Sequence, residues 1–178
     1  MSETDDANES TVIIRPATAA DRAGVVALAP RLAEGVAPWR NQREALDAGR
    51  RWLEGSLDDA AAGTGTVFVA VDERAAAGPA PSATGGIVGV VSVHPSEHFT
   101  GERDGYIGEL VVTERAARRG IGRSLIDAAE AWARDQGLAH LTLHTGAYNA
   151  SARAFYAALG FAEEEVRLTR PVSSPPGT

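Results

Sequence analysis

The chain has no cysteine among its 178 residues. Disulfides, thiolate metal sites and cysteine nucleophiles are therefore excluded, and a cytoplasmic location is expected. Long apolar runs are absent too, since no stretch approaches the ~20 residues that a membrane-spanning helix needs. Residues 1–10 have neither the basic region nor the apolar stretch of a secretory signal. We expect no membrane association, and we predict disordered tails at 1–10 and 171–178.

An excess of positive charge is the next feature that the chain lacks. Its formal net charge is −7, whereas domains that bind nucleic acid usually carry a basic surface. We therefore expect no nucleic-acid partner, and a cationic ligand would be easier to accommodate. What is present, 44% hydrophobic and 23% charged residues, is typical of a soluble globular domain.

Apolar periodicity predicts alternating strands and helices between the two tails. Strands are expected at 11–17, 66–73, 87–95, 106–113, 138–145 and 163–170. Helices are expected at 18–32, capped by Thr18 and Asp21, and at 41–57, 121–136 and 149–159, with 74–86 as a linker. In the second helix, Leu46, Trp52 and Leu53 are core candidates. This order predicts a mixed α/β sheet with both faces covered.

The segment RRGIGRSL, residues 118–125, lies where a predicted strand leads into a predicted helix. The first N–H groups of a helix have no internal partner, and with the helix dipole they attract anions. Gly120 and Gly122 let a ligand approach the backbone, while Arg118, Arg119 and Arg123 add positive charge. The pattern predicts a diphosphate site; a solvated arginine-rich loop is the alternative.

A second segment, NASARAFYAALGF, covers residues 149–161. Asn149 fits an N-cap, and Gly160 fits a helix stop against which Phe161 packs back. Phe155 and Tyr156 belong to one apolar helix face. Packing alone could therefore explain the whole segment, with Tyr156 as a core residue.

Together, ELVVTERAARRGIGRSL and NASARAFYAALGF resemble the acetyl-CoA-dependent N-acetyltransferases of the GNAT superfamily. In that family an LVV-like strand leads to a Gln/Arg-x-x-Gly-x-Gly/Ala loop, and an Asn-x-x-Ala-x-x-Phe-Tyr-x-x-x-Gly-Phe segment follows. The likeness is strong over 106–161. Two positions depart from the pattern: Ala117 replaces Gln or Arg, and Arg118 stands where glycine is frequent. The resemblance implies a single N-acetyltransferase domain over 11–170, with a mixed, mostly antiparallel sheet of six or seven strands and about four helices.

The resemblance also implies acetyl-CoA as co-substrate. The strand Leu110, Val111 and Val112 would pair with the pantetheine arm, and a main-chain N–H of Val111 or Val112 would stabilise the oxyanion. The other implied cofactor-binding residues are Arg118, Arg119, Gly120, Ile121, Gly122, Arg123, Asn149 and Ser151.

The family's direct transfer to an amine implies an acid and a base. Tyr156 would protonate the leaving thiolate, because a phenol with a pKa of ~10 suits that leaving group. Glu109 is the first candidate for the base, although it could equally be a strand carboxylate paired with an arginine. Other candidates are His94, Glu97, His98 and Glu102. No metal site is expected, and His140 and His144 are expected to be structural strand residues.

The acceptor is expected to be an amine on a small molecule or peptide, and a homodimer stays open. Trp39 and Phe99 could wall an apolar acceptor, whereas Arg40 and Arg43 could receive a carboxylate. A protein from another functional class, an acyl-CoA-binding sensor of the same fold that transfers nothing, is the alternative.

Overall fold

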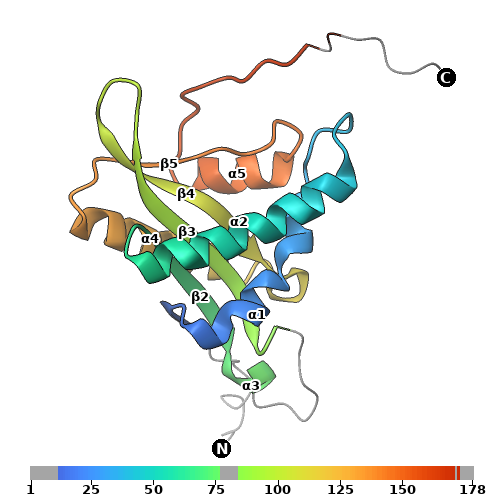
Figure 1. The fold of residues 1–178 in the computed structure, drawn as a ribbon, viewed down its shortest axis with the longest axis vertical. Coiled ribbons are helices and arrows are strands. Elements are labelled where there is room, and N and C mark those ends of the chain that lie inside the picture. The colour runs from blue at the N-terminus through green and yellow to red at the C-terminus, as the bar shows by residue number, and fades with distance from the viewer. Residues whose placement is uncertain (1–11, 77–83, 171, 173–178) are drawn as a thin grey trace, which may run out of the picture.

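A computed structural model describes residues 12–76, 84–170 and 172. The predicted tail at 1–10, most of the tail at 171–178 and most of the linker at 74–86 lie outside the described residues. The described strands form one five-stranded sheet in sequence order (Figure 1). They are β1 (Val12–Pro16), β2 (Thr66–Asp72), β3 (Ile87–Glu97), β4 (Arg103–Val112) and β5 (Leu141–Leu143). The first four pair antiparallel, and β5 lies parallel to β4.

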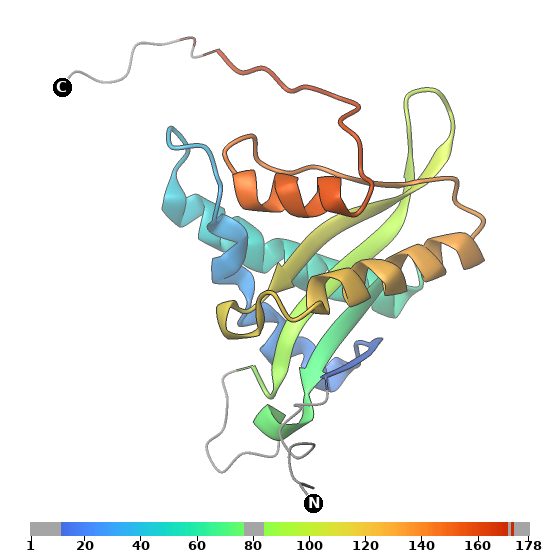
Figure 2. The same cartoon turned by 180° about the vertical axis from the view of Figure 1, so that it is seen from behind.

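Helices cover both faces of this sheet. The α-helices are α1 (Arg22–Val26), α2 (Gln42–Ala62), α3 (Glu73–Ala76), α4 (Ile121–Asp135) and α5 (Ala150–Ala158). Three 3-10 turns are η1 (Ala19–Asp21), η2 (Ala29–Ala33) and η3 (Glu114–Ala116). α1 and α2 lie on one face (Figure 1), and α4 and α5 lie on the other (Figure 2). Within the described ranges, no helix has the length and apolar character to cross a membrane.

Two apolar clusters hold the layers together, one on each face of the sheet. Under α2, Leu53 packs with Val25, Val69 and Val90. Under α4, the packed side chains are Leu125, Ala129, Val88, Val91 and Ile107. The helical spacing expected from Ile121 onward is confirmed, because Ile121, Leu125 and Ala129 are all buried. The predicted α/β class is confirmed as well.

The predicted strand count is wrong, because the described residues form five strands rather than six or seven. Residues 163–170 form no strand, and Val166 and Leu168 are 78% and 89% exposed. The expected strand at 138–145 is confined to Leu141–Leu143. An alternating pattern reports only a preference for extended backbone, and a strand also needs an edge to pair with. The three-residue β5 offers little edge.

The predicted helix at 18–32 is broken into η1, α1 and η2. Pro30 lies four residues after Val26, where α1 ends, and a proline ring clashes with the carbonyl four residues before it. The predicted capping box at its start is confirmed, since the Asp21 carboxylate accepts from the Thr18 N–H at 2.7 Å. Arg15 donates two hydrogen bonds to the same carboxylate, which holds the pKa of Asp21 well below its ordinary value.

The second predicted helix forms as α2 and extends to Ala62, with Asn41 as its N-cap. Of its three core candidates, only Leu53 is buried. Leu46 and Trp52 are 39% and 59% exposed, so this prediction was wrong for both. Successive helical residues are about 100° apart, so Trp52 points away from the sheet when Leu53 points into it.

Candidate active site

β4 carries a bulge at Gly108 and Glu109, opposite Ser92 of β3. Val93 pairs with Ile107 and Val91 pairs with Leu110, so Ser92 faces two residues, Gly108 and Glu109. The extra residue lets Ile107 and Leu110 both face the α4 cluster. It also turns Glu109 to the opposite side, where its side chain reaches α2.

Beyond the bulge, β4 has an open edge. β5 pairs only with Gly105–Ile107. The Thr113 N–H donates to the Val88 carbonyl at 2.8 Å, and N–H groups alternate in direction along a strand. The Val111 N–H therefore points to β3, whereas the N–H groups of Leu110 and Val112 point to the open edge. Here β4 runs between α4 and α5, as Figure 2 shows.

The predicted junction of loop and helix lies at one end of that edge. Gly120 is the residue before α4, with φ of 79°, and a Cβ atom placed on it would meet nothing within 4 Å. The α4 hydrogen bonds begin with the Ser124 N–H donating to the Gly120 carbonyl at 3.1 Å. The preceding N–H groups, including those of Ile121 and Gly122, therefore have no partner within the helix and point out of its start.

The side chains of this loop are not equivalent. Arg119 lies 3.7 Å from Asp72 at the end of β2, so its charge is partly balanced there. A Cβ on Gly122 would lie 3.1 Å from Phe155, so this glycine allows α5 to pack on α4. Arg118 and Arg123 are exposed, and Arg118 has a left-handed φ of 59°, unusual for a residue with a side chain.

α5 carries the other predicted cofactor and acid residues. Asn149 caps it, accepting the Ala152 N–H at 3.1 Å, and Ser151 is exposed in its first turn. The Tyr156 ring contacts Phe155 and Phe161 edge-on, with centroids 5.3 and 5.6 Å away. Burial raises the pKa of Tyr156 to about 12. Tyr156 is thus part of the packing on α5 and also stays protonated at neutral pH.

Glu109 is buried, with 6% of its surface exposed. Its carboxylate accepts a hydrogen bond from Ser56 of α2 at 2.8 Å and another from Ser92 of β3. Its own N–H donates to the Ser92 hydroxyl at 2.9 Å. Among the described residues its partners are therefore serines, rather than the arginine that an ion pair would need.

The other candidate bases separate into two places. The His94 Cε1 atom lies 4.0 Å from where a Cβ of Gly108 would be, beside both serine hydroxyls. His98 instead bonds Thr100 at 2.8 Å at the tip of the hairpin and lies 3.8 Å from Glu164. Glu97 and Glu102 belong to the same tip. In the part of the chain described, no three potential ligands are grouped to hold a metal ion.

Sequence reasoning missed three residues near Glu109, which are Ser56, Ser92 and Tyr106. The Tyr106 hydroxyl lies 3.0 Å from the His144 Nδ1 atom, and its ring lies 5.3 Å from that of His94. His144, expected to be a structural strand residue, follows β5 and is exposed. Alternation along the strand could have suggested Tyr106, but the bulge that puts it on one side with Glu109 has no sequence signal.

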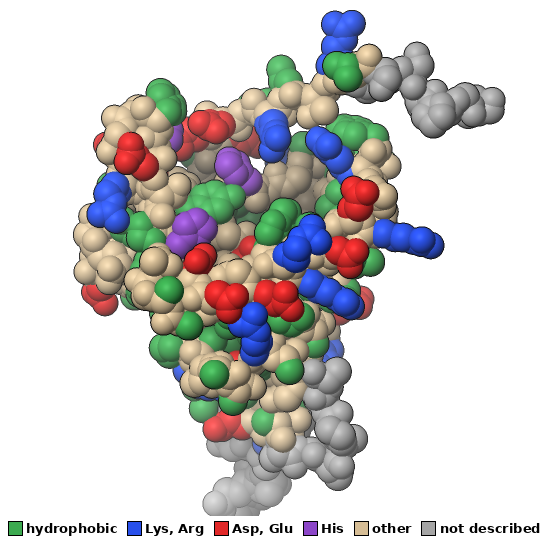
Figure 3. Space-filling model, in the orientation of Figure 1, with side chains coloured by type: hydrophobic (Ala, Val, Ile, Leu, Met, Phe, Trp, Pro, Cys, Tyr) green, Lys and Arg blue, Asp and Glu red, His purple; other side chains and the backbone are tan. Residues whose placement is uncertain are grey.

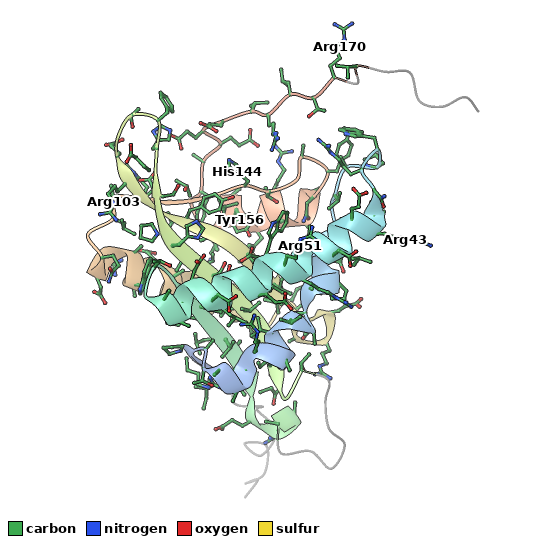
Figure 4. All side chains as sticks on the ribbon, viewed as in Figure 1. Arg43, Arg51, Arg103, His144, Tyr156 and Arg170 are labelled. Atoms are coloured by element: carbon green, nitrogen blue, oxygen red, sulfur yellow. The ribbon has the colours of Figure 1, made fainter. Side chains whose placement is uncertain are left out.

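The surface is hollowed above this cluster. The hollow lies between the β3–β4 hairpin, α2 and the segment 162–170, and histidines line it (Figure 3). His144 and Tyr156 both lie in this region (Figure 4). On the nearby surface of α2, Trp52, Arg40 and Glu44 are among the residues lining a groove of about 240 Å³.

Comparison with known proteins identifies the family. The acetyltransferase (GNAT) family model matches residues 30–161, which is more than half of the chain. The chain belongs to this family. A Bacillus subtilis (strain 168) relative, the uncharacterized N-acetyltransferase YhdJ, is 35% identical over 83 residues, 46% of this chain and 54% of that protein. The match thus spans about half of the relative's length.

Solved structures confirm the fold. A putative acetyl transferase from Pyrococcus furiosus has a TM-score of 0.70 at 19% identity, covering 91% of this chain and 100% of its own. AAC(6')-Iy in complex with the bisubstrate analog CoA-S-monomethyl-acetylneamine has a TM-score of 0.60 at 20% identity, covering 92% and 100%. The predicted resemblance to the GNAT superfamily is confirmed.

Proposed function

We propose that this protein transfers an acetyl group from acetyl-CoA to a primary amine by direct attack in a ternary complex. The observation that carries the proposal is the open edge of β4, from Leu110 to Val112, leading to the exposed start of α4 at Gly120. An extended ligand with a diphosphate at one end matches this arrangement, and the family membership supports it.

The cofactor would lie along the edge as an added strand. The pantetheine arm would bond to Leu110 and Val112, and the Val112 N–H, which points to this edge, is better placed than that of Val111 to polarise the thioester carbonyl. The N–H groups from Arg118 to Arg123 would hold the pyrophosphate. Asn149 and Ser151 would meet the arm from α5.

Glu109 and Tyr156 would move the protons. The Glu109 carboxylate is tied to two serines, so it would take the amine proton through a water molecule rather than by direct contact. Tyr156 would donate its proton to the departing thiolate. The raised pKa of Tyr156 keeps its hydroxyl protonated, but it also makes Tyr156 a weaker acid.

The acceptor would enter from the hollow on the α2 side, near the α2 groove that Trp52 and Glu44 line. Trp52 is 59% exposed there, and Trp39 meets Tyr148 edge-on at 5.6 Å. A small-molecule or peptide amine suits this surface. The AAC(6')-Iy complex, with an amine and CoA joined in one ligand, supports the direct reaction.

The test is acetyl transfer from isotope-labelled acetyl-CoA to a panel of amines, read by mass spectrometry. The panel contains amino acids, polyamines, aminoglycosides and peptide N-termini. The chain has no lysine, so side-chain amines of the protein cannot consume the label. Binding of acetyl-CoA with no labelled product from any amine would favour the alternative, a non-catalytic sensor.

A further inference from the structure

A buried base has to return its proton to solvent after each turnover. Glu109 is 6% exposed, and within the described residues its carboxylate accepts hydrogen bonds from two serine hydroxyls. A carboxylic acid formed there would therefore be held away from bulk water. Turnover requires a route from this pocket to the surface.

Within the described residues, a line of polar groups leads outward from Glu109. Gly108 lies beside Glu109, and the position of its missing Cβ is 2.8 Å from the Ser92 hydroxyl, 3.9 Å from the Ser56 hydroxyl and 4.0 Å from the His94 ring. Gly108 is exposed and has no side chain, so solvent can approach the Ser92 hydroxyl and the His94 ring at this position.

The line continues through two rings to the surface. The His94 ring packs 5.3 Å from the Tyr106 ring, and the Tyr106 hydroxyl is 3.0 Å from His144 Nδ1. His144 is exposed beside the hollow (Figure 4). The charge of Glu109 also acts on Tyr106, whose pKa is raised by burial first and by this carboxylate second.

We propose that Tyr106 and His144 form the exit path for the amine proton, carrying it from the Glu109 pocket to solvent. This inference rests on the proposed acetyl transfer. Tyr106 and His144 are positioning residues in this scheme, since they act through Glu109 and water and touch neither the acetyl group nor the thiol.

The proton balance is simple. The ammonium proton of the acceptor passes to Glu109 through water, and the freed amine attacks the thioester. Tyr156 protonates the departing thiolate, and the second nitrogen proton, released as the tetrahedral intermediate collapses, restores Tyr156. The Glu109 proton then moves through water to the Tyr106 oxygen while the Tyr106 O–H proton moves to His144 Nδ1. The resulting imidazolium releases one proton from Nε2 to bulk water, and exchange with solvent restores the starting tautomer. One proton leaves for each amine acetylated.

The experiment compares His144→Ala with His140→Ala in the full chain. His140 is a matched control because it lies at the other end of β5, is 61% exposed in its side chain, and bonds Asp104 rather than Tyr106. Acetyl transfer to an amine from the panel is measured at constant pH over a series of imidazole concentrations. Melting temperatures establish that each variant is folded, and His144→Gln replaces the alanine variant if needed.

We expect kcat of His144→Ala to fall about tenfold, below the usual range for a direct acid or base because water offers a slower path. Added imidazole should restore it, while KM for both substrates stays unchanged. The kcat of Tyr106→Phe should fall by a similar factor. Wild type and His140→Ala should not respond to imidazole.

Full activity of His144→Ala, or a loss that imidazole does not relieve, would overturn the exit path while leaving acetyl transfer intact. Absence of product from the wild-type protein with every amine would instead overturn the proposed function, and the exit path with it. The two failures are distinguished by whether the wild type turns over.

Discussion

The two halves of β4 differ in what they offer a ligand. From Leu110 to Val112 the strand presents its backbone to an open edge, and its side chains pack into the core clusters. In the other half, the Glu109 side chain meets α2 and β3, and the Tyr106 side chain meets the loop after β5. In the proposed reaction, the first half would hold the extended cofactor, and the second half would meet the acceptor and move its proton.

The largest effect is expected at the cofactor end, from Gly120→Val. Gly120 has φ of 79°, with open space in front of it where the pyrophosphate would lie. A valine would put branched carbons into that space and strain the backbone. We expect acetyl-CoA affinity, measured by calorimetry, to fall at least about a hundredfold, in line with losing several charge-assisted hydrogen bonds.

Gly137→Val is the matched control. Gly137 follows the other end of α4, with φ of 68° and nothing within 4 Å of an added Cβ. The melting temperature of Gly137→Val should fall about as much as that of Gly120→Val, whereas its affinity for acetyl-CoA should stay unchanged. Equal affinities for Gly120→Val and wild type would contradict the phosphate site.

The second largest effect is expected at Tyr156, whose ring packs on α5 and whose hydroxyl is the proposed acid. Tyr156→Phe keeps the ring contacts with Phe155 and Phe161 and removes only the hydroxyl. We expect kcat to fall about a hundredfold, the low end for general acid catalysis, with acetyl-CoA affinity within a few-fold of wild type. Unchanged turnover would identify Tyr156 as a core residue only.

The pH dependence of Tyr156 follows from its raised pKa. Its folded pKa of about 12 lies above the ordinary value of 10. The hydroxyl therefore remains protonated through the alkaline range in which most amines lose their proton, and its ionisation should not limit kcat below about pH 10. Stability contributed by the neutral form should be lost only as the pH rises from the ordinary value toward the folded one.

A smaller effect is expected at Glu109, in the side-chain half of β4. Glu109→Gln keeps an oxygen to accept from Ser56 and Ser92 but removes the base. We expect kcat/KM to fall about tenfold to a hundredfold, most strongly at low pH where the amine is protonated, with little change in acetyl-CoA affinity. Joint loss of melting temperature and cofactor binding would instead indicate a structural carboxylate.

The start of α4 and the cap of α5 were largely predictable from the sequence, for a physical reason. A helix start, a left-handed glycine and an N-cap are local events, so Gly120 and Asn149 report them directly. The side-chain half was not predictable in the same way. Ser56 lies 53 residues from Glu109 and Tyr106 lies 38 from His144 along the chain.

Two kinds of error have distinct causes. The prediction of a helix at 18–32 was wrong because one proline outweighs the favourable pattern around it. Pro30 could have been interpreted as a helix stop. The prediction of a strand at 163–170 was wrong because the residues of a segment do not encode its pairing partner. The β4 bulge is of the second kind, since it depends on how β3 and β4 align.

The smallest effect is expected at Arg118, where backbone strain and charge can be separated. Its left-handed φ of 59° costs roughly 1–2 kcal/mol for a residue with a side chain. Arg118→Gly removes the strain and the charge, whereas Arg118→Ala removes the charge alone. The melting temperature of Arg118→Gly should therefore be a few degrees above that of Arg118→Ala, although the greater freedom of glycine in the unfolded chain offsets part of the gain. If the guanidinium binds the pyrophosphate, both variants should bind acetyl-CoA about equally and a few-fold more weakly than wild type at low salt. Wild-type affinity in both variants would mean that the backbone N–H groups bind the phosphates without Arg118.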